Sequence, residues 1–380
     1  MRSARPLLLA AGLAAALAFA LPLRPAGAQD EACAYAAAVC DARQAVFVIS
    51  DFSPIASAVR LGPDLLVTAR HAVAEGDEVE VLLPGRAILK GRVVPSPLPL
   101  DLVLLRVPGL PEGPVLKPAA LAEDGEEEPA LHVVGADIGA ARVEAYPPGA
   151  AIARPLEDKP LSRLHHGAHT QPGNSGGALV DGEGRLVGIA VAGGSGRFEA
   201  IPASAIAALR AASGPEAEAA EAGFQAAVRD CSLGLEALGD GQAPEGAAAD
   251  VLAARCLATG NRQFYDLAGQ VFGRAGDLER ATALFEASLE QDPQALNARL
   301  SLAITLHMAQ RWERELPHLH WLIERLPRDP QVLRLAVQAG KWTGDAALAE
   351  QGYRGIQAHF PAQAEAARGF LDSDASPPPR

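Results

Sequence analysis

Short apolar runs, separated by glycine and proline, fill the chain from Gln44 to about residue 213. Alternation is clearest where Glu78 and Glu80 stand between apolar neighbours, as expected of a strand with one buried face. Many short strands with frequent turn residues are typical of an antiparallel sandwich or barrel. The predicted strands are 45–49, 65–68, 79–83, 87–89 with 92–94, 102–107, 131–134, 141–146, 162–166, 177–180, 186–192 and 198–201, followed by a helix over 203–212.

The stretch at 108–130 divides these strands into two sets. It is rich in proline at first and acidic over 123–128. We interpret it as a solvated connector between two halves of one domain over 44–213. A calcium-binding loop is the alternative for such an acidic run.

From about Pro215 the pattern changes to Ala, Leu, Glu and Arg with helical period, and no strand pattern returns. We predict two helices over 216–238 and 247–258, joined by a loop at 239–246. They form a helical hairpin within 214–260.

A repeated pattern follows over 261–371, where prolines at positions 293, 330 and 361 end similar helical blocks. The first block is the clearest: small Gly269 and Ala281 allow two helices to approach, and Phe272 and Phe285 fill the space between them. This spacing resembles a tetratricopeptide repeat of about 34 residues. We expect an all-α repeat domain there and a disordered tail over 372–380.

The first 28 residues have the pattern of a signal peptide. Arg2 and Arg5 precede a Leu/Ala run that ends near Leu21, and Ala26-Gly27-Ala28 fits a processing site. Cleavage near Ala28 would leave a short lead over 29–43 and a periplasmic or secreted protein. An uncleaved anchor is the alternative, although the run is shorter than the ~20 residues of a membrane span. No later stretch of the sequence is long enough to span a membrane.

Composition narrows the function classes. The chain has 380 residues, is 49% hydrophobic and carries a net charge of −13. A packed core is attainable, and an acidic chain argues against a nucleic-acid partner. We expect no cofactor and no bound metal. Protein or peptide substrates are the expected partners, with protein binding or self-association through the repeats.

Four cysteines occur, an even number that suits two disulfides in an exported chain. Pairing of neighbours is favoured among the three connectivities, and a zinc site is the alternative. The favoured pairs are Cys33–Cys40 and Cys231–Cys256.

The candidate chemistry centres on Ser175 in the turn Gly173-Asn174-Ser175-Gly176-Gly177. Close glycines let the backbone of such a turn approach another group, so its N–H groups can form an oxyanion hole. A hydroxyl nucleophile also needs a base and a carboxylate. His71 follows an apolar strand, and Asp101 opens another, where an acid is costly to bury without a partner.

These residues stand in motifs that resemble the trypsin-like serine proteases, most closely the bacterial HtrA-type exported peptidases. The matching segments are V-T-A-R-H at His71, D-L-V-L-L at Asp101 and G-N-S-G-G-A-L-V at Ser175. The resemblance implies two six-stranded β-barrels with the site between them, and a His71–Asp101–Ser175 triad. It also implies an oxyanion hole in the turn formed by Gly173, Asn174 and Ser175, with the N–H groups of Gly173 and Ser175 as donors.

Three departures from the family refine this expectation. Asn174 replaces the acid that pairs with a newly cut amino terminus in many digestive members, so we expect activity without such a cut. No acid stands at His169, which favours small or medium apolar residues at the cleavage site. Val191 replaces a hydroxyl that often supports the aspartate, so Asp101 is expected to use backbone donors. The predicted pocket wall comprises His169, Thr170, Val191, Ala192, Gly193 and 197–200.

Five further histidines can be interpreted either as structural residues or as functional ones. His165, His166 and His169 could bind a metal or sense pH, but local packing is favoured. His318 and His320 are expected at a surface or groove. Two alternative functions remain open, a catalytically inactive scaffold with a protease fold and an acyl hydrolase that uses the same triad.

Overall fold

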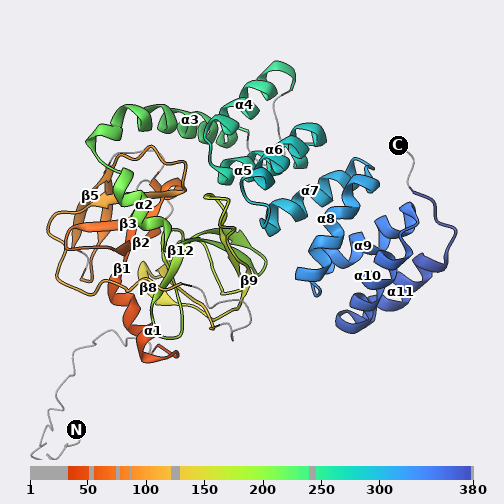
Figure 1. The fold of residues 1–380 in the computed structure, drawn as a ribbon, viewed down its shortest axis with the longest axis horizontal. Coiled ribbons are helices and arrows are strands. Elements are labelled where there is room, and N and C mark those ends of the chain that lie inside the picture. The colour runs from red at the N-terminus through yellow and green to blue at the C-terminus, as the bar shows by residue number, and fades with distance from the viewer. Residues whose placement is uncertain are drawn as a thin grey trace, which may run out of the picture. The chain divides into compact units, whose positions relative to one another are not determined.

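The computed structural model describes residues 33–50, 55–73, 78–85, 87–120, 129–238 and 245–377. The predicted signal peptide, the acidic run at 123–128 and most of the loop at 239–246 lie outside the described residues. Tyr35–Arg380 forms one unit, separate from Met1–Ala34. Figure 1 shows the order of its elements, with strands in the first half and helices in the second.

The first six strands close into an antiparallel barrel in the order β1-β2-β3-β6-β5-β4. Strand β2 was not predicted, because its Ala-Ser-Ala-Val-Arg sequence has few large apolar residues, yet all five positions are buried. The barrel elements are α1 Ala37–Asp41, η1 Ala42–Ala45, β1 Val46–Ser50, β2 Ala56–Arg60, β3 Leu65–Ala69, η2 Arg70–Val73, β4 Glu78–Leu82, β5 Ile88–Val94 and β6 Leu102–Arg106.

The second set of strands forms a sheet of seven segments in the order β8-β7-β11-β12-β13-β10-β9. Its two edge segments follow one another in the chain: β8 pairs with β7, β9 pairs with β10, and Leu131 and Gly149 form a bridge between these pairings, which agrees with the predicted trypsin-like fold. The short strand β9 was not predicted. These strands are β7 His132–Asp137, β8 Arg142–Ala145, β9 Ala151–Ala153, β10 Leu164–His166, β11 Ala178–Val180, β12 Leu186–Gly194 and β13 Arg197–Pro202.

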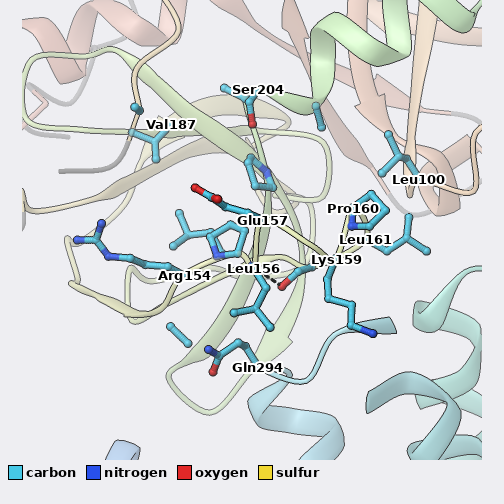
Figure 2. A pocket seen from close by; sticks show the side chains of 18 of the residues that line it. Leu100, Arg154, Leu156, Glu157, Lys159, Pro160, Leu161, Val187, Ser204 and Gln294 are labelled. Atoms are coloured by element: carbon cyan, nitrogen blue, oxygen red, sulfur yellow. Dashed lines mark hydrogen bonds between the residues drawn. The ribbon is translucent and has the colours of Figure 1, made fainter. Parts of the chain in front are cut away.

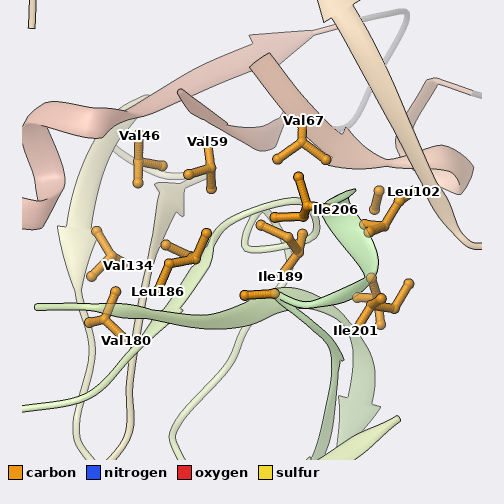
Figure 3. Packing of buried hydrophobic residues seen from close by; sticks show 14 of the residues in the cluster. Val46, Val59, Val67, Leu102, Val134, Val180, Leu186, Ile189, Ile201 and Ile206 are labelled. Carbon is orange, nitrogen blue, oxygen red and sulfur yellow. The ribbon is translucent and has the colours of Figure 1, made fainter. Parts of the chain in front are cut away.

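One apolar cluster joins the barrel to the second sheet. Val59 and Val67 of the barrel pack in the same cluster as Val180 and Ile189 of the sheet, and Figure 3 shows them facing one another. Helix α2, Ala205–Ala212, adds Ile206 to this cluster. The shared core fixes the two halves relative to each other, and the loops between them can therefore form one site.

Helices follow to the C-terminal end of the described chain, as predicted. They are η3 Pro215–Ala217, α3 Glu218–Glu236, α4 Gly246–Ala258, α5 Arg262–Arg274, α6 Leu278–Gln291, α7 Leu296–Met308, α8 Trp312–Arg325, α9 Pro330–Thr343, α10 Ala346–His359 and α11 Pro361–Asp372. None of the helices described is both long enough and apolar enough to cross a membrane. The predicted tail starts later than expected, since Asp372 still belongs to α11, and 378–380 lie outside the described residues.

All four cysteines are disulfide-bonded, which rules out the zinc alternative. Cys231 of α3 and Cys256 of α4 are 4.8 Å apart at their Cα atoms and join the predicted hairpin. Cys33 and Cys40 form the other bonded pair, so the favoured connectivity is confirmed.

The first repeat block packs as its small and aromatic residues predict. A Cβ atom at Gly269 would lie 2.8 Å from the ring of Phe285, so only glycine fits against that ring. Phe272 and Ala281 are fully buried beside it. The assignment of these helices to the tetratricopeptide family stays a prediction, as do the domain boundaries.

Candidate active site

His71 and Asp101 lie at the same end of two neighbouring strands. His71 belongs to η2, directly after β3, and Asp101 directly precedes β6. The two strands are antiparallel, with Ala69 opposite Leu102, so the end of one meets the start of the other. The backbone N–H of Arg70 donates to the Asp101 carbonyl at 3.1 Å. The register of the sheet therefore brings together two side chains distant in sequence.

Three side chains form a continuous hydrogen-bonded chain. The Nδ1 atom of His71 lies 2.7 Å from Oδ2 of Asp101, and its Nε2 atom lies 3.1 Å from Oγ of Ser175. The backbone N–H of His71 also donates to Oδ1 of Asp101 at 3.0 Å. A nucleophile, a base and an orienting carboxylate are thus within the reach that proton transfer requires.

Asp101 is only 1% exposed. Burial by itself would raise the pKa of this carboxyl, but His71 lowers it through charge and hydrogen bonds, and the Arg163 guanidinium adds to that effect. The net result is a pKa below the usual range. Arg163 Nη2 lies 3.7 Å from Oδ2 of Asp101. The buried acid is therefore held in its charged form, which suits a partner for a histidine that gains a proton.

The turn that carries Ser175 is fastened to strand β2 by Ser57. The Ser57 hydroxyl donates to the Gly173 carbonyl at 2.7 Å and accepts from the Ala136 N–H at 2.7 Å, while the Ser57 N–H donates to the Ser175 carbonyl at 2.8 Å. Gly176 has φ +82°, and a side chain there would overlap the Ser57 carbonyl. The turn therefore depends on glycine and on an element that the sequence pattern did not predict.

Two backbone N–H groups of the turn are available to a ligand. Within the described chain, no hydrogen bond uses the N–H of Gly173 or of Ser175. The Asn174 N–H instead donates to the Gln171 carbonyl at 3.0 Å. Asn174 was included in the predicted oxyanion set, and this bond removes it as a donor.

The side chain of Asn174 stabilises the turn from inside. Asn174 is fully buried, its Oδ1 accepts from the Gln171 N–H at 2.9 Å, and its Nδ2 donates to the Ala136 carbonyl at 3.0 Å. Both ends of the neutral amide are thus satisfied by backbone groups of the same domain. No charged partner is needed to keep the turn in this arrangement.

The predicted pocket residues differ in their exposure, and one of them lies close to the nucleophile. Val191 is buried and its carbonyl lies 3.5 Å from the Ser175 hydroxyl, whereas Ala192 is half-buried and Gly193 exposed. His169 is exposed, with its ring 6.4 Å from that of Phe198 in an edge contact. The Thr170 hydroxyl is occupied, because it donates to the Ala168 carbonyl at 3.1 Å.

The histidine cluster does not gather at one point. His165 is buried with Nε2 3.0 Å from Asp292, while His166 packs its ring 6.1 Å from that of Phe198. Burial, with a contribution from His165, lowers the pKa of His166 to about 3. Among the described residues, no group of His, Cys, Asp and Glu side chains is arranged to hold a metal ion.

Two of the four histidines in the helices after Pro215, His318 and His320, interact with side chains of those helices. His320 Nε2 is 2.7 Å from Asp345, and His318 Nδ1 is 3.3 Å from an Arg299 nitrogen. Burial and Arg299 lower the pKa of His318 to about 4. Both interactions are internal to the helices.

A wide cavity of about 1480 Å³ lies apart from the triad. Figure 2 shows Glu157, Lys159 and Ser204 around it, with Gln294 contributed by the helical segment. Leu100 is its lining residue next to the site, and none of the three triad side chains lines it. Ser162 lines this cavity and donates to Asp292 at 2.8 Å, but no histidine is among the lining residues, so the cavity is not the candidate active site.

Two side chains that contact the Asp101 carboxylate were missed from the sequence. Arg163 approaches its Oδ2, and Asn261 Nδ2 donates to its Oδ1 at 3.1 Å. Asn261 belongs to the helical segment and is distant in sequence from every motif of the site. No pattern around it signals this role, whereas the missing hydroxyl at Val191 did signal that Asp101 needed another donor.

Comparison with known proteins agrees with this geometry. Residues 56–189 match the family described as trypsin-like peptidase domain. No curated protein matches the chain. The matched residues thus resemble a trypsin-like peptidase domain, and helices follow them in the chain.

Several solved structures are similar to the same part. One is the Rv3671c protease of M. tuberculosis in an inactive form, with 25% identity, 46% of this chain and 91% of that chain covered and a TM-score of 0.39. Another is the HtrA-type protease AlgW with tripeptide, with 27% identity, 46% and 61% covered and a TM-score of 0.40. The serine endoprotease from Yersinia pestis is 21% identical, with 46% and 64% covered and a TM-score of 0.39. These TM-scores are low, and no conclusion about this chain rests on them.

Proposed function

We propose that the protein is an exported serine endopeptidase that hydrolyses peptide bonds through Ser175, His71 and Asp101. One observation carries the proposal: the hydrogen-bonded chain from Ser175 Oγ through the His71 ring to the buried Asp101 carboxylate. That arrangement is the working geometry of a nucleophilic hydroxyl with its base and its orienting acid. The match to the trypsin-like peptidase family supports the same reaction class.

The roles follow from the positions of the atoms. Ser175 Oγ attacks the peptide carbonyl while His71 Nε2 takes its proton, and His71 then gives that proton to the leaving amine. Asp101 holds the ring by its Nδ1–H and stabilises the charged imidazolium. The Gly173 and Ser175 N–H groups hold the oxyanion, and losing one such donor typically costs about 10²–10³ in rate.

The substrates are proteins or peptides, and the preferred residue before the cut is small or medium and apolar. Support comes from two apolar residues of the predicted pocket wall, since Val191 is buried and Phe198 is 6% exposed. His169 stands at the position where an acid would favour basic residues. Its exposed ring carries no fixed negative charge that could bind a lysine or arginine side chain.

Activity needs no prior internal cut. The Asn174 amide is satisfied by Gln171 and Ala136 in the intact chain, so the turn is already in place. An enzyme that stays silent until it is clipped would contradict this part of the proposal.

Export and a role for the repeats complete the proposal. Two disulfides are stable in a periplasmic or secreted protein and rare in a reducing cytosol. The helical repeats contact a protein partner or a second copy of the chain, since stacked helical repeats commonly present such surfaces.

Fluorophosphonate labelling of the purified mature protein tests the core of the proposal. We expect labelling of wild-type protein, none of the Ser175→Ala variant, and cleavage of members of a peptide library by wild type alone. An unlabelled and inert wild type would favour the scaffold alternative. Rapid hydrolysis of simple esters without peptide cleavage would favour the acyl hydrolase.

A further inference from the structure

Four polar side chains of the helices after Pro215 contact residues of the strand-rich domain. One of them reaches the triad itself, and another reaches the neighbour of His71. The contacts are Glu221 with Arg70 at 2.5 Å, Asn261 with Asp101 at 3.1 Å, Asp292 with His165 at 3.0 Å and Asp329 with Arg197. Arg70 is the neighbour of His71 in sequence, so both members of the His–Asp pair have a helical-segment partner close by.

Asn261 makes the most direct of these contacts. It is 2% exposed and is the N-cap residue of α5. Its Oδ1 accepts the Gln263 N–H at 3.0 Å, while its Nδ2 donates to Asp101 Oδ1 at 3.1 Å. The amide therefore has one end committed to starting the helix and the other to the carboxylate of the site.

The two oxygens of Asp101 have different partners. Oδ2 faces the ring Nδ1 of His71, and Oδ1 accepts from the His71 N–H and from Asn261. Two donors on Oδ1 resist rotation of the carboxylate, which keeps Oδ2 in line with the ring. Hydrogen bonds to charged groups are stronger than those between neutral groups, and the bond from Asn261 to Asp101 is shielded from water.

A buried cluster of charges fixes the backbone beside Asn261. The next residue, Arg262, has a side chain only 1% exposed, pairs with Glu199 and lies 3.4 Å from Asp292. Glu199 also binds Arg163 at 3.1 Å. Buried ions without partners are costly, so these groups hold the start of α5 against the peptidase domain.

We propose that Asn261 is a positioning residue for Asp101, through which the helical segment completes the active site of the peptidase domain. The proposal rests on the serine peptidase function proposed above. It predicts that turnover depends on a side chain outside the peptidase fold, and that the dependence appears in kcat instead of KM, because Asn261 touches no substrate.

Substitutions at Asn261 separate this role from helix capping. Asn261→Ser keeps a good N-cap, because serine is equivalent to asparagine there, but its side chain is too short to reach Asp101. Asn261→Asp keeps the size and the cap acceptor, but turns a carboxylate toward Asp101 in place of a donor. Asp345→Ala is the matched control, since Asp345 caps α10 by accepting the Leu348 N–H and lies outside the site.

The full-length variants are compared by kcat and KM on a cleaved peptide, with active enzyme counted by fluorophosphonate labelling. We expect Asn261→Ser to lower kcat roughly tenfold to a hundredfold, as befits one lost hydrogen bond to a charged group, with KM unchanged. The kcat of Asn261→Asp should be lower still, although aspartate matches asparagine in size. Asp345→Ala should unfold at lower urea concentration and keep wild-type kcat.

The pH profile gives a readout that a purely structural role would not move. The charged groups facing Asp101 are His71 and Arg163, with Glu199 and Arg262 behind them. Removing the Asn261 donor leaves more negative charge for His71, so the acid limb of kcat/KM should move to higher pH. Wild-type kcat per labelled Ser175 in Asn261→Ser would overturn the proposal. An unlabelled, inert wild type would overturn the proposed function and this role together.

Discussion

Asn174→Asp is the sharpest test of the preformed nucleophile turn, because it changes one atom of a fully buried side chain. The amide Nδ2 of Asn174 donates to the Ala136 carbonyl at 3.0 Å, and an aspartate would place an oxygen against that carbonyl oxygen. The other bond, from the Gln171 N–H to Oδ1 at 2.9 Å, survives the change. The substitution thus removes one hydrogen bond, leaves an acceptor unpaired and adds a buried charge.

The expected cost follows from these three effects. A buried acceptor without its donor costs about 1–3 kcal/mol, and more when the group is charged. The new carboxyl avoids part of the charge penalty by keeping a proton, which raises its folded-state pKa above the unfolded value of about 3.9. Stability relative to wild type is then least affected below about pH 4 and falls by about 1.4 kcal/mol per pH unit up to the folded pKa. We expect a loss of about 2–4 kcal/mol at pH 7.

Urea unfolding between pH 4 and pH 8 measures this cost, in a Ser175→Ala background that prevents self-cleavage. Asn297→Asp is the matched control, because it also loses an amide donor, from Nδ2 to the Arg197 carbonyl at 2.9 Å, but its new charge meets Arg197 Nε, which lies 3.0 Å from Oδ1. The control loses the same kind of hydrogen bond but should not become less stable as the pH rises from 4 to 8. A loss below about 1 kcal/mol at pH 8, with no dependence on pH, would refute the argument that the turn relies on a neutral side chain.

Three further outcomes are expected. Ser57→Ala should lower kcat and cost about 1–3 kcal/mol, as measured by peptide turnover and urea unfolding, because the Gly173 carbonyl loses its donor; unchanged kcat would count against the role of β2. Burial raises the pKa of Asp266 to about 6 despite Arg262, so stability from this group is lost as pH rises through about 6. Asp266→Asn should not show this loss of unfolding free energy between pH 5 and pH 8. An equal change in unfolding free energy in wild type and variant would contradict the prediction. Replacing Cys231 and Cys256 by alanine should lower the unfolding free energy by about 2–4 kcal/mol, and an equal value would show that the bond is not formed in solution.

The elements that could be predicted from sequence are those whose signal is local. The strands around His71 and Asp101 have continuous apolar runs, and the turn at Ser175 has glycines on both sides. The helix boundaries of α3 and α4 also follow from periodicity. Strand β2 was not predicted because alanine and serine have little preference for strands, although its residue Ser57 holds the nucleophile turn.

The second sheet shows what the family resemblance added to the hydrophobic pattern. The pattern alone missed the three-residue strand β9, yet β9 pairs with β10, β8 pairs with β7, and the bridge between Leu131 and Gly149 lies between these pairings. This joining of the two ends of the sheet agrees with the fold that the resemblance implied. Hydrophobic patterning does not specify the length and register of such short segments.

The contacts between the helical segment and the site were beyond sequence-based prediction for a different reason. Hydrophobic periodicity identifies the face of a helix that packs in a core, but Asn261, Arg262 and Asp292 meet the peptidase domain through polar groups. Such residues usually face water, so each one considered alone is expected at the surface. These residues can be buried because Asp101 and Glu199 pair with them, and a sequence pattern does not show that pairing.

The burial of these groups argues against treating the helical segment as a separable attachment. Arg163 and Glu199 belong to the peptidase domain, yet both are buried together with Arg262 from α5. If α5 moved away, Glu199 would lose Arg262 and would depend on Arg163, which also approaches Asp101. Breaking one buried ion pair costs about 3–5 kcal/mol, a large fraction of the stability of a typical domain. Any force or partner that opens this contact would therefore disturb the surroundings of Asp101.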